Sequence, residues 1–292
     1  MTSLRAGVIG VGHLGQHHAR HYATLPGVTL AGVYDASPDR AKLIAERHGV
    51  QAWTNLADVL KQVDLVSVAA PTSAHFAAAK ACLEAGKHVL VEKPIAVTSA
   101  EARELVELAA RQGCLLQVGH SERFNPIMQR MRGSIERPAF IEGHRLSAFG
   151  ERGTDVDVVL DLMIHDIDII LSLVKGDVRN IYASGVAVMT ETPDIANVRI
   201  EFDNGAVANL TSSRISMKRM RKMRLFQKDA YIGIDFLDKK AEVIKIKQPT
   251  DVDVFSFDVD TPDGNKKTIA VANPNIEEGN AIKLELQSFI NA

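Results

Sequence analysis

One glycine-rich turn limits the folds open to this chain more than any other feature. An apolar strand near residues 5–9 runs into Gly10, Gly12 and Gly15, which have the G-x-G-x-x-G spacing, and a helix follows. In such a turn the first glycine allows the sharp bend, the second lets the backbone approach a pyrophosphate, and the third lets the helix pack close to the strand. The sequence therefore predicts a dinucleotide-binding domain. The alternative is a glycine-rich turn in another kind of α/β protein.

The residues around this turn indicate which dinucleotide binds. Asp35 ends the second apolar run, where its carboxylate can accept hydrogen bonds from both ribose hydroxyls. That charge disfavours the 2′-phosphate of NADP, so we expect NAD, although Arg40 is close enough in sequence to weaken the preference. His13 and Leu14 are further predicted cofactor residues, because they lie at the helix N-terminus that faces the phosphates.

Composition excludes several classes of function. The 292 residues suffice for one large or two ordinary domains, and a net charge of −2 provides no general attraction to nucleic acid or to a membrane. No apolar stretch is long enough for a membrane span, and the first strand begins too early for a signal peptide, so we expect a cytoplasmic protein. We expect no metal site: Cys82 and Cys114 lack metal-site spacing, and a solvated helix face is expected for His17, His18 and His21.

The first part of the chain alternates between strands and helices. Strands are predicted at 5–9, 28–34, 64–69, 87–91 and 114–118, with helices near 14–24, 37–47, 55–62, 73–85 and 99–111. These strands are apolar throughout, which is typical of a parallel sheet covered on both faces. We therefore predict a doubly wound α/β domain of the Rossmann type over residues 1–120.

The pattern changes after His120, and residues 121–292 form the second predicted domain. A helix is expected over 156–174, followed by strands at 178–189, 195–202, 205–213, 222–226, 230–236 and 241–247. Residues 248–274 predict a mobile hairpin or loop, and a last helix should start near Asn275. This order predicts an α+β domain whose sheet has an open face. A large exposed apolar face would favour a homo-oligomer, either a homodimer or a homotetramer.

Polar side chains follow two strands of the first domain at the edge where open α/β sheets bind ligands. Glu92-Lys93-Pro94 follows the fourth predicted strand, so Lys93 would lie near the nicotinamide with its ammonium directed at a substrate hydroxyl. A cis bond at Pro94 can fix that direction. Pro71, Thr72 and His75 follow the third strand and are predicted cofactor contacts, as is Glu92. The alternative for Lys93 is a surface lysine before a turn.

Asp161 and His165 lie four residues apart in the long helical stretch, which puts them on one helix face. A histidine beside a carboxylate can act as a general base, because its pKa is near the working pH and the carboxylate can orient it. The alternative is a core histidine satisfied by a local acid. At the junction of the two domains, His120, Arg123 and Asn125 are predicted to contact the substrate or the nicotinamide.

A basic run interrupts a chain that is slightly acidic overall, and it contains Arg214, Lys218, Arg219, Arg221, Lys222 and Arg224. Alternate strand positions share a face, so Arg219 and Arg221, or Lys222 and Arg224, could bind a diphosphate. A solvated strand face or a salt-bridged subunit interface is the alternative. Nucleic acid is disfavoured because the run is short and lacks interleaved aromatic residues.

In their order along the chain these motifs resemble the Gfo/Idh/MocA family of NAD(P)-dependent sugar oxidoreductases. The motifs are the glycine-rich turn with its acid, Glu92-Lys93-Pro94, Gly119-His120-x-x-Arg123-Phe124-Asn125-Pro126 and Asp161-x-x-x-His165. The resemblance covers nearly the whole chain. It implies a Rossmann domain followed by a domain with a large, mostly antiparallel sheet that commonly forms oligomer interfaces. It also implies that Lys93 is the catalytic lysine, and that Asp161 and His165 are the acid–histidine pair at the sugar. Met163 departs from the family pattern, in which a glycine is common between that acid and histidine.

A closer resemblance concerns the substrate. Residues 155–168 and 208–214 resemble the subgroup that oxidises the 3-hydroxyl of UDP-N-acetylglucosamine and supplies a keto sugar nucleotide to an aminotransferase, on the way to a diamino sugar of lipid A. It implies hydride transfer to NAD, with Lys93 and His165 handling the hydroxyl proton in either order. Two rivals stay open: a dehydrogenase of a free sugar or polyol such as myo-inositol, and a non-catalytic dinucleotide sensor.

Overall fold

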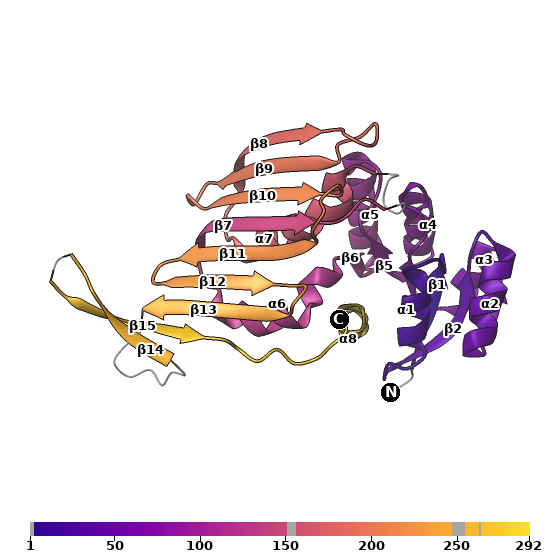
Figure 1. Ribbon diagram of the computed structural model, residues 1–292. Coiled ribbons are helices and arrows are strands. Elements are labelled where there is room, and N and C mark those ends of the chain that lie inside the picture. The colour runs from indigo at the N-terminus through magenta and orange to yellow at the C-terminus, as the bar shows by residue number, and fades with distance from the viewer. Residues whose placement is uncertain (1–2, 151–155, 247–254, 263) are drawn as a thin grey trace. The chain divides into compact units, whose positions relative to one another are not determined.

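The computed structural model describes residues 3–150, 156–246, 255–262 and 264–292, which form two compact units (Figure 1). The first unit comprises Met1–Phe124 and Asn280–Ala292, and the second comprises Asn125–Gly279. The first boundary thus falls at Phe124 rather than at residue 120, and the last helix, which the sequence analysis assigned to the second domain, belongs to the first unit.

Six parallel strands form the sheet of the first unit, in the order β3-β2-β1-β4-β5-β6. The strands are β1 (Leu4–Ile9), β2 (Val28–Tyr34), β3 (Gln51–Trp53), β4 (Leu65–Val68), β5 (His88–Glu92) and β6 (Leu116–Gly119). The helices between them are α1 (Gly15–Tyr22), α2 (Pro38–His48), α3 (Leu56–Gln62), α4 (Thr72–Glu84) and α5 (Ser99–Gln112), followed by the short helix η1 (Ser121–Phe124). This strand order is that of the dinucleotide-binding Rossmann fold, with its switch point between β1 and β4.

Local signals explain where these helices begin and end. Ser37 caps α2, with Pro38 at its first position, and Gly49 ends the helix with a positive φ of 65°. Thr98 and Glu101 form a capping box at the start of α5. The strands are buried on both sides, as the apolar runs predict, and the predicted doubly wound fold is confirmed.

The last helix, α8 (Ala281–Asn291), completes the core of the first unit. Its Leu286 and Phe289 are buried in one cluster with Tyr22 and Leu25 from the region of α1. The helix begins at Ala281, with Asn280 as its cap, and not near Asn275 as the sequence indicated.

Nine strands form the sheet of the second unit, in the order β14-β15-β13-β12-β11-β7-β10-β9-β8. They are β7 (Pro138–Leu146), β8 (Val178–Val186), β9 (Ile195–Phe202), β10 (Val207–Ser213), β11 (Met220–Gln227), β12 (Ala230–Asp235), β13 (Lys240–Ile246), β14 (Phe255–Asp260) and β15 (Lys266–Ala272). Within the described residues, β7 and β10 are the one parallel pair. The predicted large, mostly antiparallel sheet is therefore confirmed.

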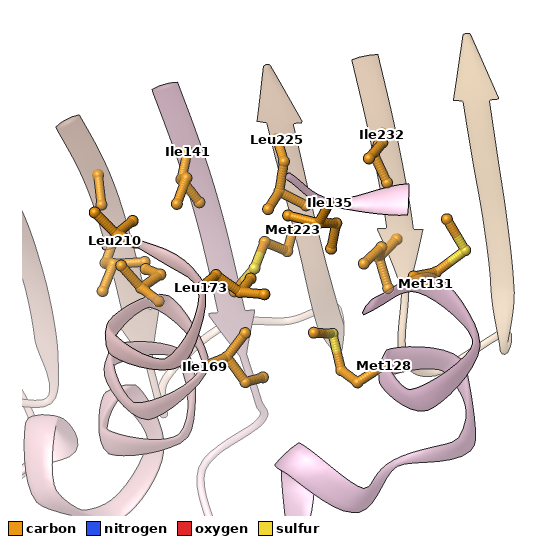
Figure 2. Packing of buried hydrophobic residues seen from close by; sticks show 14 of the residues in the cluster. Met128, Met131, Ile135, Ile141, Ile169, Leu173, Leu210, Met223, Leu225 and Ile232 are labelled. Atoms are coloured by element: carbon orange, nitrogen blue, oxygen red, sulfur yellow. The ribbon is translucent and has the colours of Figure 1, made fainter. Parts of the chain in front are cut away.

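Two helices cover one face of this sheet (Figure 2). They are α6 (Pro126–Met131), which the short helix η2 (Arg132–Ser134) extends, and α7 (Ile164–Leu173), which the π-helical turn η3 (Val159–Met163) precedes. Met128 and Met131 of α6 and Ile169 and Leu173 of α7 point at strand residues Ile141, Leu210, Met223, Leu225 and Ile232. The opposite face is open, as predicted.

Several elements differ from the sequence-based expectation. Strands β3 and β7 and helix α6 were not predicted, and the expected helix over 156–174 contains a π-helical turn. Strands β14 and β15 pair as the expected hairpin, while Asp155, 247–254 and Asp263 lie outside the described residues. In the part of the chain that is described, no helix combines the length and apolarity needed to cross a membrane, and no group of three or more metal-ligating side chains is present.

Candidate active site

The glycine-rich turn between β1 and α1 has three glycines with different surroundings. Gly10 has a φ of 82°, and a Cβ at Gly15 would lie 1.8 Å from the carbonyl oxygen of Gly10, so neither position accepts a side chain without a backbone shift. A Cβ at Gly12 would meet no atom within 4 Å. The turn therefore needs two glycines for its own shape, while Gly12 faces open space. This arrangement fits the close approach of a pyrophosphate.

Asp35 is buried directly after β2 and ties the turn to that strand. Its Oδ2 accepts the Val11 N–H at 2.8 Å, and its Oδ1 accepts the Ser37 N–H at 2.9 Å. The largely exposed Arg40 places Nη1 3.4 Å from Oδ1. The predicted cofactor acid therefore also shapes the loop in which the phosphates are expected.

The cofactor residues predicted after β4 lie at the start of α4. Pro71 is the N-cap residue and Thr72 the first residue of the helix. His75 is buried, and its ring nitrogens lie 2.8 Å from the carbonyl oxygens of Pro94 and Ala70. The histidine thus joins the loop after β4 to the loop after β5.

Lys93 follows the last residue of β5 and is partly buried. The Lys93–Pro94 peptide bond is cis, as the sequence analysis anticipated. The Lys93 N–H donates to Oε2 of Glu92 at 3.3 Å, and the Pro94 carbonyl lies against His75. Backbone contacts on both sides therefore fix the tripeptide that carries the lysine.

The histidines of α1 do not form the solvated face that the sequence predicted, since His17 is partly buried and the other two are buried. His13 is exposed, and the edge of its ring packs against His17 at 5.4 Å between centroids. His18 and His21 are buried. His18 is within hydrogen-bond distance of Glu92 and Ser67, contacts that no local sequence pattern indicates.

Asp161 and His165 of the second unit lie where the π-helical turn meets α7. Asp157 starts this segment, since its Oδ1 accepts the N–H groups of Val159 and Leu160. Asp161 lies within η3, and His165 is the second residue of α7; both are partly buried. Met163, where many family members have glycine, is fully buried in the core. π-Helical turns inside α-helices are rare and occur often at functional sites.

A buried ion pair that the sequence did not reveal supports this segment. Arg145 of β7 donates to Asp166 of α7 through Nε at 3.0 Å and Nη2 at 2.8 Å, and both side chains are almost fully buried. Because Asp166 directly follows His165, this two-pronged pair fixes the helix to the sheet next to the predicted base.

The basic run divides between the two faces of the sheet and the interior. Arg221 alternates with the buried Met223 and Leu225 of β11, so it lies on the helix-covered face, opposite Arg145. Lys222 and Arg224 lie on the open face, where they pair with Asp235 and Glu142, respectively. Two pairs were predicted to bind a diphosphate. Only Arg221, from the pair Arg219 and Arg221, lies in β11 on the face that α7 covers.

Arg214, the first residue of the run, is buried and is not a surface cation. It donates through Nε to Oδ1 of Asp194 at 2.8 Å and through Nη1 to the Val156 carbonyl at 2.7 Å. Burial alone would raise the pKa of Asp194, but the N–H of Met189, Arg214 and further backbone N–H groups hold that pKa well below its usual range. This network attaches the start of the Asp161 segment to the end of β10.

The residues predicted at the domain junction fall in different units. His120 follows β6, and Arg123 lies in η1 of the first unit. Asn125 is the first residue of the second unit and caps α6, accepting the Ile127 N–H at 3.2 Å.

Comparison with known proteins identifies the family. A profile of the oxidoreductase family with an NAD-binding Rossmann fold matches residues 4–120, and one of the GFO/IDH/MocA C-terminal domain matches residues 128–232. The chain belongs to the Gfo/Idh/MocA family. The family predicted from the motifs is thus confirmed, and its first unit is an NAD-binding Rossmann domain.

Members of the Gfo/Idh/MocA family with assigned activities are among the relatives. UDP-N-acetylglucosamine 3-dehydrogenase of Acidithiobacillus ferrooxidans is 39% identical over 244 residues, covering 83% of this chain and 77% of that protein. Its solved structure matches with a TM-score of 0.89 at 36% identity, covering 100% of this chain and 89% of that one. The NAD-dependent scyllo-inositol 2-dehydrogenase of Bacillus subtilis is 29% identical over 232 residues, covering 73% of this chain and 68% of that protein.

Proposed function

We propose that this protein is an NAD-dependent dehydrogenase that oxidises the C3 hydroxyl of a UDP-amino sugar such as UDP-N-acetylglucosamine. The observation that carries the proposal is the 39% identity with a UDP-N-acetylglucosamine 3-dehydrogenase over most of both chains. The keto sugar nucleotide would serve an aminotransferase, which connects the reaction to the diamino sugar of lipid A.

The residues of the two units have complementary chemistry for this reaction. NAD, when bound, accepts the hydride from the sugar carbon. His165 takes the hydroxyl proton, Asp161 orients the imidazole, and the Lys93 ammonium stabilises the negative charge that develops on the oxygen. The converse assignment, with Lys93 as the base, satisfies the same chemistry. Gly10, Gly12, Gly15 and Asp35 hold the cofactor.

Arg221 is the residue we assign to the diphosphate of the nucleotide sugar, together with Arg219. Its position on the helix-covered face, opposite Arg145, supports this role, whereas Lys222 and Arg224 lie on the open face. Oxidation of a free polyol is the second candidate, because the scyllo-inositol dehydrogenase is a relative at 29% identity. A neutral polyol does not require these cations.

We further propose that the open sheet face joins copies of the chain into a homo-oligomer. The sequence predicted a large exposed apolar face. The open face is instead partly charged, because it carries ion pairs such as Lys222–Asp235 and Arg199–Glu201. One register row across seven strands is nevertheless apolar: Val207, Phe140, Phe226, Tyr231, Ile244, Val271 and Phe255. A continuous apolar row with a charged surround has the anatomy of a protein interface.

The test is the appearance of NADH absorbance when the purified protein and NAD are mixed with UDP-N-acetylglucosamine and an aminotransferase that removes the ketone. We expect turnover with this sugar nucleotide and none with free N-acetylglucosamine or myo-inositol. Lys93→Met should abolish turnover and keep NAD binding. Arg221→Ala should raise KM for the sugar nucleotide, whereas Lys222→Ala, on the opposite face, should not. Turnover of myo-inositol alone would favour the second candidate, and NAD binding without any turnover would favour a sensor.

A further inference from the structure

A chain of four buried polar side chains runs through the core of the first unit and ends beside Lys93. The Tyr22 hydroxyl lies 2.8 Å from the Ser67 hydroxyl, which lies 3.0 Å from Nδ1 of His18. Nε2 of His18 lies 2.9 Å from Oε1 of Glu92. Tyr22, Ser67 and His18 are fully buried, and Glu92 is only 6% exposed. The four residues come from α1, β4 and β5, so the chain crosses from the helix to two central strands.

The hydrogen bonds of this chain have one consistent direction. A carboxylate only accepts, so the Nε2–H of His18 donates to Glu92, and in the neutral imidazole Nδ1 accepts from the Ser67 hydroxyl. The Ser67 oxygen then accepts from the Tyr22 hydroxyl, which keeps its proton because burial holds the pKa of Tyr22 above its usual value. Every donor therefore points toward Glu92.

Glu92 passes this constraint to the backbone of the next residue. Its second oxygen, Oε2, accepts the Lys93 N–H at 3.3 Å. Space for the carboxylate depends on Gly119, where a Cβ would lie 2.9 Å from the carboxyl carbon. Burying an acid and a histidine between α1 and the sheet is costly unless both are satisfied, and apolar residues would fill the same volume at no such cost. Stability alone therefore does not explain the pair.

We propose that His18 is a positioning residue for the dehydrogenase reaction. It orients the Glu92 carboxylate, which fixes the backbone at Lys93 and so the direction of the lysine side chain. His75 fixes the other end of the tripeptide at the Pro94 carbonyl. This inference rests on the proposed function, in which Lys93 contacts the substrate hydroxyl.

Three variants test the role of His18. His18→Leu removes the donor to Glu92, His18→Gln keeps an N–H donor at a similar reach, and His21→Leu is the matched control. His21 is a buried histidine of the same helix, and within the described residues its Nε2 has no hydrogen-bond partner. For each variant we would measure kcat, KM, the Kd of NAD by calorimetry, and the melting temperature.

We expect His18→Leu to lower kcat roughly 10- to 100-fold, because a small misplacement of a reacting group has an effect of that size. The Kd of NAD should stay within about twofold of the wild-type value, since the four hydrogen-bonded side chains do not include a residue of the glycine-rich turn. His18→Gln should recover most of kcat, and His21→Leu should resemble the wild type. In a Glu92→Gln background, His18→Leu should have little further effect, because His18 acts through Glu92.

Two results would overturn the inference while leaving Lys93 in its proposed role. One is wild-type kcat in His18→Leu while Lys93→Met is inactive, which leaves the proposed function intact. The other is a kcat loss that follows the melting temperature or the NAD affinity and that His18→Gln does not recover, since His18 would then serve folding alone. Turnover by Lys93→Met would overturn the catalytic role proposed for Lys93, and with it this inference.

Discussion

His21 should make the stability of the first unit depend on pH. The imidazole is buried on α1, and burial, followed by the nearby charges of Arg20, His18, His17 and Lys283, lowers its pKa from 6.5 to about 4. The folded state therefore binds this proton less readily than the unfolded state does. The free energy of unfolding is therefore unaffected by His21 above about pH 6.5 and decreases as the pH falls toward 4. In that range the unfolded chain binds a proton at His21 and the folded unit does not.

The size of this effect follows from the two pKa values. Between about pH 7.5 and pH 5.5, the His21 contribution to the free energy of unfolding should fall by about 1.3 kcal/mol, and by about 2.5 kcal/mol at pH 4.5. His21→Leu has no proton to bind at this position. The difference in unfolding free energy between wild type and variant should therefore change by these amounts over the same range.

Trp53 provides the assay, because it is the one tryptophan of the chain and is buried in the first unit. Urea unfolding followed by its fluorescence, at several pH values, reports on the unit that contains His21. Comparing the two proteins removes the contribution of every other titrating group that they share. Wild-type and His21→Leu stabilities that change in parallel between pH 7.5 and 4.5 would refute the reasoning.

Three further predictions concern packing and assembly. Gly15→Ala puts a Cβ 1.8 Å from the Gly10 carbonyl oxygen, so NAD affinity measured by calorimetry should fall roughly tenfold, about 1.4 kcal/mol; affinity within twofold of wild type would contradict this. Asp166→Ala removes the carboxylate that pairs with the buried Arg145 and should cost about 3–5 kcal/mol, seen as a lower melting temperature in scanning calorimetry; an unchanged melting temperature would show that water reaches the arginine. Phe226→Asp puts a charge in the apolar row of the open face and should yield smaller species in analytical ultracentrifugation, so unchanged sedimentation would exclude this row from the interface.

The sequence predicted the first unit well because its signals are local. Capping residues, glycines at helix ends and fully apolar strands mark each element within a few residues. Strand β7 was missed because two of its inward positions are not apolar. Gly143 leaves room for Leu210, and Arg145 is satisfied by Asp166, so the alternation expected of a half-buried strand disappears. Strand β3 and helix α6 are too short to show a period.

The candidate site divides in the same way. The glycine-rich turn, Lys93 and the Asp161–His165 pair could be proposed from the sequence because their spacing is short and motif-like. The contacts that support them could not be predicted. His18 and Glu92 are 74 residues apart, and a histidine without a known partner is expected on the surface. Arg214 was counted in the basic run for the same reason, because its partner, Asp194, is 20 residues away in the sequence. Pairing between distant residues has no period or composition that one sequence can show.

Helix α8 has a consequence for how the protein is made. Its Leu286 and Phe289 close the core around Tyr22, yet the ribosome adds them only after the whole second unit. A nascent chain that has reached Phe124 therefore carries the nucleotide-binding sheet with part of its apolar surface still uncovered. We expect synthesis to leave the first unit incomplete while the second one folds, a period in which chaperones would bind near α1.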